Sequence, residues 1–173
     1  MKDVSRRDMI KTVGAGLALS LVPAASIAST GVAQAMGIPV VTRLRAAHRT
    51  DVTPNFDRVV IDMSGHMPAE IWWEYVAKLV QDGSGMEVPI EGSKKFQISL
   101  HGATAHDDGG NSTLPQRTIT PRLPIVRQVK LFSDFEGLVL VGIGLSRETR
   151  TRTLVIHDSV RQTVRAVVDF IIT

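Results

Sequence analysis

The sequence contains no cysteine among its 173 residues. This absence excludes thiolate nucleophiles, cysteine-ligated zinc, iron–sulfur clusters and lipid attachment to a leading cysteine. Aromatic residues are also scarce, at 5% of the chain, with two tryptophans and one tyrosine. Because hydrophobic residues still make up 43%, the composition predicts one globular domain that folds without a disulfide or a metal.

The N-terminus has the composition of an export signal. Arg6 and Arg7 precede a mild apolar run, 13–22, which is followed by small residues. The arginine pair resembles the twin-arginine signal of bacteria, with Met9 where phenylalanine is commoner. An apolar run of about ten residues is too short for a membrane span, which needs about 20. We therefore predict that residues 1–35 are a signal peptide, helical or disordered, whose removal leaves no stable membrane span; an amphipathic N-terminal helix is the alternative.

Much of the positive charge lies in that leader. Of the 20 basic and 17 acidic residues, the leader contains four and two, so its removal leaves 16 and 15 and lowers the net charge from +3 to +1. A nucleic-acid-binding domain needs a basic stripe or an aromatic stacking platform. The remaining basic group, Arg147, Arg150 and Arg152, is typical of a solvated hairpin turn. The sequence therefore predicts no nucleic-acid partner.

The rest of the chain has the patterns of β-strands separated by turns. Residues 56–63 are the clearest example, with Val59, Ile61 and Met63 on one face and Ser64-Gly65 at the end. Further strands are expected over 38–45, 69–80, 86–90, 94–101, 125–132, 138–145, 151–157 and 163–171. About eight strands in series predict an all-β fold, a two-sheet antiparallel β-sandwich.

Residues 69–80 admit two interpretations. In a helix, Pro68 would lie in the first turn. We favour a strand, because aromatic side chains suit a pleated surface and 82–85 follow as a hairpin-like turn. Trp72 and Trp73 then point to opposite faces, Trp73 toward the core. Trp72 is either an exposed stacking platform for sugars or, like its neighbour, a partly buried core residue.

Glycines shape the central strand predicted over 138–145. Gly142 and Gly144 fall on the same face of it, which leaves room for a close-packed neighbour or a bulge. The preceding residues, 133–137, are expected to form a turn.

The polar loop over 101–124 is the main candidate for special chemistry. Its prolines and glycines preclude regular structure, and loops this long in compact domains are uncommon and often functional. Alternation in the preceding strand places His101 on the solvent side at the entrance to the loop. The residues that we assign to ligand binding are Trp72, His101, His106, Asp107, Asp108, Asn111 and Thr113.

The loop residues suit several kinds of chemistry. Residues 107–111 offer oxygens to calcium but lack the alternating spacing of a calcium loop. His101, His106 and His157 with Asp107 would form a transition-metal site only if they converged. In the simplest alternative, Asp and Asn bond to nearby backbone amides and glycine supplies positive φ. We assign no metal ligand, no cofactor and no catalytic residue.

A set of short sequence blocks resembles one known family. Those blocks include Phe56-Asp57-Arg58-Val59-Val60, Ala105-His106-Asp107-Asp108, Asp134-Phe135-Glu136-Gly137 and Gly142-Ile143-Gly144-Leu145. They resemble the AMIN-like domain of exported actinobacterial proteins, a relative of the AMIN domain of cell-wall amidases and secretins. The resemblance covers most of 40–173 and implies a β-sandwich that acts outside the cytoplasmic membrane, with peptidoglycan contact by analogy.

Three functions are consistent with these observations. The first is a secreted or cell-envelope binding module without catalytic activity, which contacts cell-wall glycan or peptidoglycan through the 101–124 loop. The second is a metal-dependent hydrolase in which His106 and Asp107 activate water. The third is a structural domain whose edge strands pair with an envelope protein. We favour the first, because no catalytic signature of high specificity is present.

Overall fold

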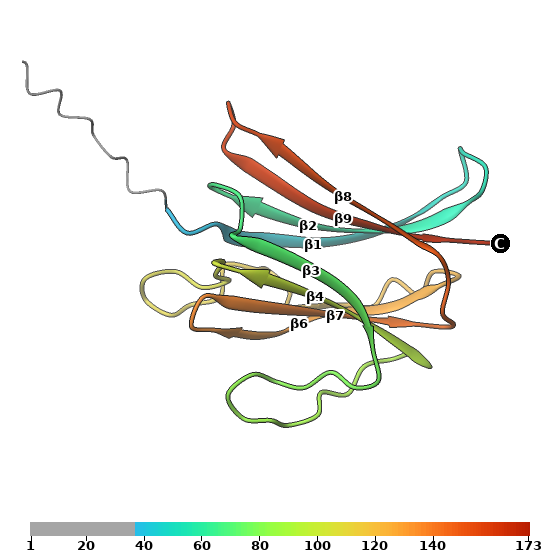
Figure 1. The fold of residues 1–173 in the computed structure, drawn as a ribbon, viewed down its shortest axis with the longest axis horizontal. Helices are drawn as coiled ribbons and strands as arrows, with labels where there is room; N and C mark the ends of the chain where they lie inside the picture. Colours follow the sequence, from blue (N-terminus) through green and yellow to red (C-terminus); the bar gives the residue numbers. More distant parts are fainter. Residues whose placement is uncertain (1–36) are drawn as a thin grey trace, which may run out of the picture. The chain divides into compact units, whose positions relative to one another are not determined.

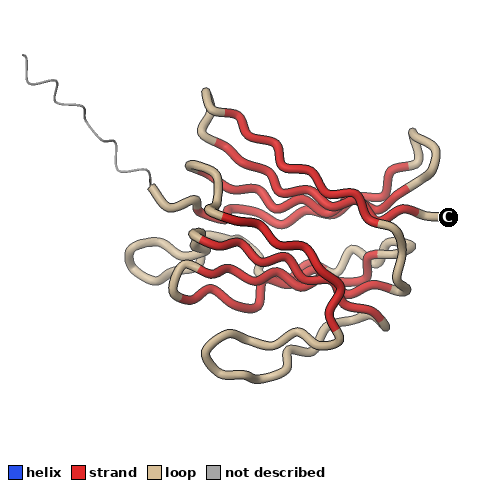
Figure 2. The backbone as a smooth tube through the Cα atoms, viewed as in Figure 1, coloured by secondary structure: helices blue, strands red, loops and turns tan. Residues whose placement is uncertain are grey.

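The computed structural model describes residues 37–173 as two stacked antiparallel sheets (Figure 1). Strands, turns and loops account for all of this range, as Figure 2 shows. None of its segments is a helix long and apolar enough to cross a membrane. The predicted signal peptide, with Arg6 and Arg7, lies outside the described residues.

The first sheet has the order β1-β2-β9-β8 and the second β3-β4-β7-β6-β5. The first consists of β1 (Val40–Arg49), β2 (Phe56–Ser64), β8 (Thr151–Asp158) and β9 (Thr163–Ile171). The second consists of β3 (Glu70–Val76), β4 (Lys94–His101), β5 (Thr118–Ile119), β6 (Val126–Phe135) and β7 (Leu138–Leu145). The predicted antiparallel β-sandwich is confirmed, with nine strands in the described range where about eight were expected. The short β5 lies within 101–124, so the prediction of no regular structure there is wrong for these two residues, which pair with β6.

One hydrophobic core fills the space between the sheets. Val59, Ile61 and Met63 of β2 face it, as predicted, and so do alternate residues of β4. Phe96 of β4 meets Phe170 of β9 edge to face, with ring centroids 5.4 Å apart. This aromatic contact joins the two sheets directly.

The strand interpretation of 69–80 is confirmed, but the strand ends at Val76. The following segment, 77–93, folds over the outer face of the second sheet as the green loop in Figure 1. Leu79 is fully buried there against Phe132 and Leu140 on the outer face. An uninterrupted strand over 69–80 would have placed it on the inner face with Trp73. The strand predicted over 86–90 is wrong, because this segment packs by its side chains and makes a single bridge, Val80 to Glu87.

Gly142 and Gly144 of β7 make room for that segment, which confirms the predicted close-packed neighbour. A Cβ atom on Gly142 would overlap the Leu79 side chain, and one on Gly144 would overlap the backbone carbonyl of Glu91. A side chain end can rotate away, whereas a backbone carbonyl cannot. Gly144 is therefore the stricter requirement.

A buried carboxylate ties the sheets together at one end of the sandwich. Asp57 of β2 is 0% exposed. Its Oδ2 accepts the backbone N–H of Ile125 (2.6 Å) and of Val126 (2.9 Å), where β6 of the opposite sheet begins. Its Oδ1 lies 2.7 Å from Nδ1 of His48 on β1. Charge-assisted bonds of this kind are stronger than neutral ones, and leaving such a carboxylate unpaired in the core is costly.

Replacing Gly144 with alanine should lower the free energy of unfolding by about 1–3 kcal/mol, because the Glu91 backbone must shift and disturb the packing of 77–93. Urea denaturation measures this change. Gly37→Ala is the matched control, since a Cβ there meets nothing within 4 Å. Equal stability of the two variants would contradict the close packing.

Candidate binding site at the 101–113 loop

The loop after β4 is anchored to the turn between β6 and β7. Gly102, with φ +71°, turns the chain at the end of β4, and the N–H groups of Gly102 and Ala103 donate to the carbonyl of Gly137 at 2.8 and 3.0 Å. That turn is only Glu136-Gly137, both with positive φ, as a two-residue hairpin requires. The turn predicted over 133–137 is therefore too long, and Asp134 belongs to β6.

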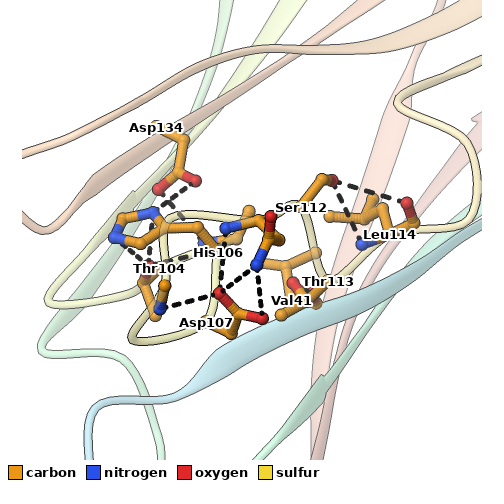
Figure 3. A network of polar contacts seen from close by, with 11 residues as sticks. Val41, Thr104, His106, Asp107, Ser112, Thr113, Leu114 and Asp134 are labelled. Carbon is orange, nitrogen blue, oxygen red and sulfur yellow. Dashed lines mark hydrogen bonds and ion pairs between the residues drawn. The ribbon is translucent and has the colours of Figure 1, made fainter.

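Asp134 holds the middle of the loop (Figure 3). Its side chain is 5% exposed; Oδ1 accepts the N–H of Ala105 at 3.1 Å and Oδ2 lies 2.8 Å from Nδ1 of His106. Because Nδ1 faces a carboxylate, it donates to Asp134. The hydroxyl of Thr104 lies 2.9 Å from Nδ1 and 3.3 Å from Nε2. His106 itself is largely exposed, so its ring edge is accessible to a ligand.

Asp107 organises a tight turn at the tip of the loop. Its Oδ1 accepts the backbone N–H groups of Gly109 and Asn111, both at 2.9 Å, and the Asn111 side-chain amide lies 3.3 and 3.2 Å from its two oxygens. The bonds from Asn111, its backbone N–H first, lower the pKa of Asp107 below the usual 3.8. The simplest interpretation, bonding to nearby backbone amides, is confirmed for Asp107, whereas the Asn111 side chain bonds to the Asp107 carboxylate instead.

A depression of about 790 Å³ opens beside the loop. The lining residues are Gly37, Ile38, Val40, Thr104, His106, Asp107, Asp108, Gly110, Thr113, Glu136 and Gly137. This set contains three acidic residues and no lysine or arginine. The wall is therefore electronegative and offers acceptor oxygens to hydroxyl or ammonium groups.

Trp72 lies on the outer face of β3 and is 56% exposed. Its ring packs against that of His101 in a tilted arrangement, with centroids 4.6 Å apart and planes at 50°. Trp73 faces the core. The exposed position of Trp72 is thus confirmed over the alternative of two partly buried tryptophans, while its role as a platform for sugars stays a prediction. His101 is half-buried under it, and its Nε2 has no hydrogen-bond partner in the described part of the chain.

The predicted site residues fall into two adjoining groups. Trp72 and His101 form one, and His106, Asp107, Asp108 and Thr113 line the depression of the other. The two groups adjoin at the β6–β7 turn, because His101 pairs with Leu138 while Gly137 lines the depression. Asn111 supports the turn of Asp107 from within the loop.

Sequence analysis missed Asp134 and Glu136 as members of this region. An acidic residue beside Phe-Glu-Gly was interpreted as part of a turn, as such residues usually are. Alternation from Val129 and Leu131 places Ser133 inward and Asp134 outward, but the register shift between Leu131 and Ser133 brings Asp134 to the inner face opposite Val139, which the sequence did not signal. A carboxylate at an inward position near a strand end predicts a buried acceptor for loop amides.

Metal ligands do not gather in the part of the chain that the structure describes: no group of three or more His, Asp and Glu side chains there is placed to hold an ion. His157 lies on β8 of the first sheet and His101 on β4 of the second. The convergence of His101, His106, Asp107 and His157 that the metal hypothesis requires is therefore not found.

Comparison with known proteins identifies one family. The family model for the AMIN-like domain matches residues 39–171, a range that contains all nine strands and the loop. No curated protein and no solved structure shows significant similarity to the chain.

The pKa of Asp107 should lie below 3.8 in the folded protein, as measured by NMR titration of its carboxyl carbon. A depressed folded-state pKa means that the turn is stabilised above pH 3.8 and loses this contribution as the pH falls through the folded-state value. Asn111→Ala should raise the midpoint only in part, because the backbone N–H of residue 111 remains. A midpoint at or above 3.8 in the unaltered protein would show that these bonds do not form.

Proposed function

Because the chain belongs to the AMIN-like domain family, we propose that it is an exported, non-catalytic module that contacts peptidoglycan or another cell-envelope glycan. At the family level the assignment fits a peptidoglycan-related binding role. The predicted twin-arginine signal supports export to the envelope or beyond. The contact surface is formed by Trp72, His101 and the acidic depression beside them, and it is called the loop surface below.

The exposed Trp72 is the observation that supports this proposal most directly. An indole left 56% exposed on a sheet loses the stabilisation that burial would provide, and large exposed apolar groups commonly mark interaction sites. The ring offers an apolar face to the C–H groups of a sugar, while the neighbouring carboxylates accept hydrogen bonds from its hydroxyls. An apolar platform beside a few polar groups is the usual composition of a small-molecule site.

A hydrolytic role for His106 and Asp107 has less support. The Asp107 carboxylate is occupied by the N–H groups of its own turn, and the Nδ1 of His106 is paired with Asp134. The Asp107 carboxylate is therefore less available to take a proton from water, as the paired role of the two residues requires. Its geometry suits the ordering of its own turn better than general base catalysis.

Trp72→Ala should weaken the affinity of the protein for purified peptidoglycan roughly three- to tenfold, since aromatic contacts contribute about 0.5–1.5 kcal/mol. Sedimentation of the protein with the peptidoglycan measures this affinity. The assay is run at low and moderate salt. Val160→Ala is the control, because Val160 is an exposed apolar residue, at 91%, that lies in the β8–β9 turn of the other sheet.

Failure of the unaltered protein to sediment at either salt concentration would contradict the proposal. Recovery of one envelope protein in stoichiometric amount, without binding to the wall, would instead identify strand pairing at the sheet edges as the function.

A further inference from the structure

The outer face of the first sheet gathers arginines from all four of its strands. They are Arg43, Arg45 and Arg49 of β1, Arg58 of β2, Arg152 of β8 and Arg165 of β9. The register places all of them on the side opposite to Val59 and Ala166 of the core. Arg152 therefore lies in a strand, and its assignment to a solvated turn is wrong. We call this surface the arginine face.

The centre of the arginine face contains two guanidinium groups for one carboxylate. Asp169 is 2% exposed and accepts hydrogen bonds from Arg58 (2.7 and 3.0 Å) and from Arg152 (2.6 and 3.0 Å). Burial raises the pKa of Asp169, but the bonds from both arginines outweigh it and the net pKa is lowered. Both guanidinium groups also lie over the ring of Phe56, at 5.1 and 5.2 Å from its centroid. The two arginines thus favour the ionised form of the carboxylate, and the cluster has one positive charge in excess.

A second carboxylate, Asp62, is surrounded by three arginines. Arg45 binds it with two hydrogen bonds of 2.6 and 2.7 Å. Arg165 reaches it only at 3.7 Å, and Arg43 lies opposite it in the register of β1 and β2. No acidic side chain lies within ion-pair distance of Arg43 between residues 37 and 173. Arg43 and Arg165 therefore keep most of their hydrogen-bonding capacity for a ligand.

Charge is segregated between two parts of the surface. Against the six arginines the face has Asp51, Asp62, Asp158 and Asp169, which leaves a surplus of two positive charges. Because the chain after the leader has a net charge of only +1, the rest of it is net negative. Three of those acidic residues line the depression of the loop surface. The two surfaces therefore suit ligands of different charge.

A second depression, of about 510 Å³, lies within the arginine face. The residues that line it include the apolar Val60, Ile156 and Val167 and the cationic Arg45 and Arg165. Val60 and Val167 are buried although they lie on an outer face, because arginine stems cover them. A lining of apolar and cationic residues accommodates a chain that alternates C–H surface with anionic groups.

We propose that the arginine face binds an anionic cell-wall polymer, a glycan or polyol chain with repeated phosphodiester groups. Arginine pairs well with phosphate oxygens, and charges spread over four neighbouring strands match a repeated anion better than a single one. Nucleic acid fits less well, because the aromatic ring of this face, Phe56, is covered by Arg58 and Arg152 and cannot stack on a base. The location in the cell wall rests on the proposed export, whereas binding of a polyanion does not.

The test uses the full chain and poly(glycerol phosphate), with fluorescence anisotropy at several salt concentrations. The double variant Arg43→Gln with Arg165→Gln should bind at least tenfold more weakly, and the slope of log affinity against log salt should fall by about 1–2. Lys78→Gln with Lys94→Gln removes the same charge from exposed positions outside the arginine face and should retain affinity. Arg165→Lys, which keeps the charge, should retain most of the binding if the double variant proves unstable.

Two outcomes would overturn this proposal. One is equal loss of affinity in the arginine and lysine double variants, which would show attraction by net charge alone. The other is tighter binding of a single-stranded oligonucleotide of equal charge, which would identify nucleic acid as the ligand. Two controls separate this proposal from the proposed function. Trp72→Ala should leave binding of poly(glycerol phosphate) unchanged. The arginine double variant should still sediment with peptidoglycan freed of anionic polymers, so either proposal can fail without the other.

Discussion

Two buried carboxylates, one at each end of β6, fix the loops that close this sandwich. Asp57 accepts the backbone N–H groups of Ile125 and Val126 across the gap between the sheets, and Asp134 accepts that of Ala105. Each carboxylate also accepts an imidazole N–H. A buried acceptor of this kind is expensive to leave unpaired, because water cannot replace the lost donor. The two carboxylates therefore fix loop segments that have little regular secondary structure of their own to hold them in place.

The proposed functions depend on this anchoring. The 101–113 loop borders an open depression because Asp134 bonds to the middle of the loop and Asp107 bonds within its tip. Trp72 and His101, which pack against each other beside this loop, lie on β3 and β4, so this part of the loop surface is built on rigid elements. The arginine face lies on the other sheet, where the register of four strands fixes its geometry. One rigid domain thus has two different surfaces. The loop surface is acidic and includes an exposed aromatic ring, and the arginine face is basic.

Strand positions were predictable wherever the two faces of a strand meet different surroundings, as in β2 and β4, since alternation then records burial. The prediction for Leu79 was wrong because this residue continues the alternation of β3 yet packs on the outer face of the sheet. Asp134 was assigned to a turn, since polar residues at strand ends usually lie there. The arginine face was invisible because its members are far apart in sequence, for example Arg43 and Arg165, and only strand register brings them together.

Amide hydrogen exchange of the unaltered protein tests most directly whether buried carboxylates hold the loops. The amides of Ile125, Val126 and Ala105 should exchange as slowly as those of the core strands, because their acceptors are shielded from water. The amide of Gly109, which donates to the exposed carboxylate of Asp107, should exchange faster. Exchange of the first three at the rate of Gly109 would contradict the account, because the loops would then open independently of the sandwich.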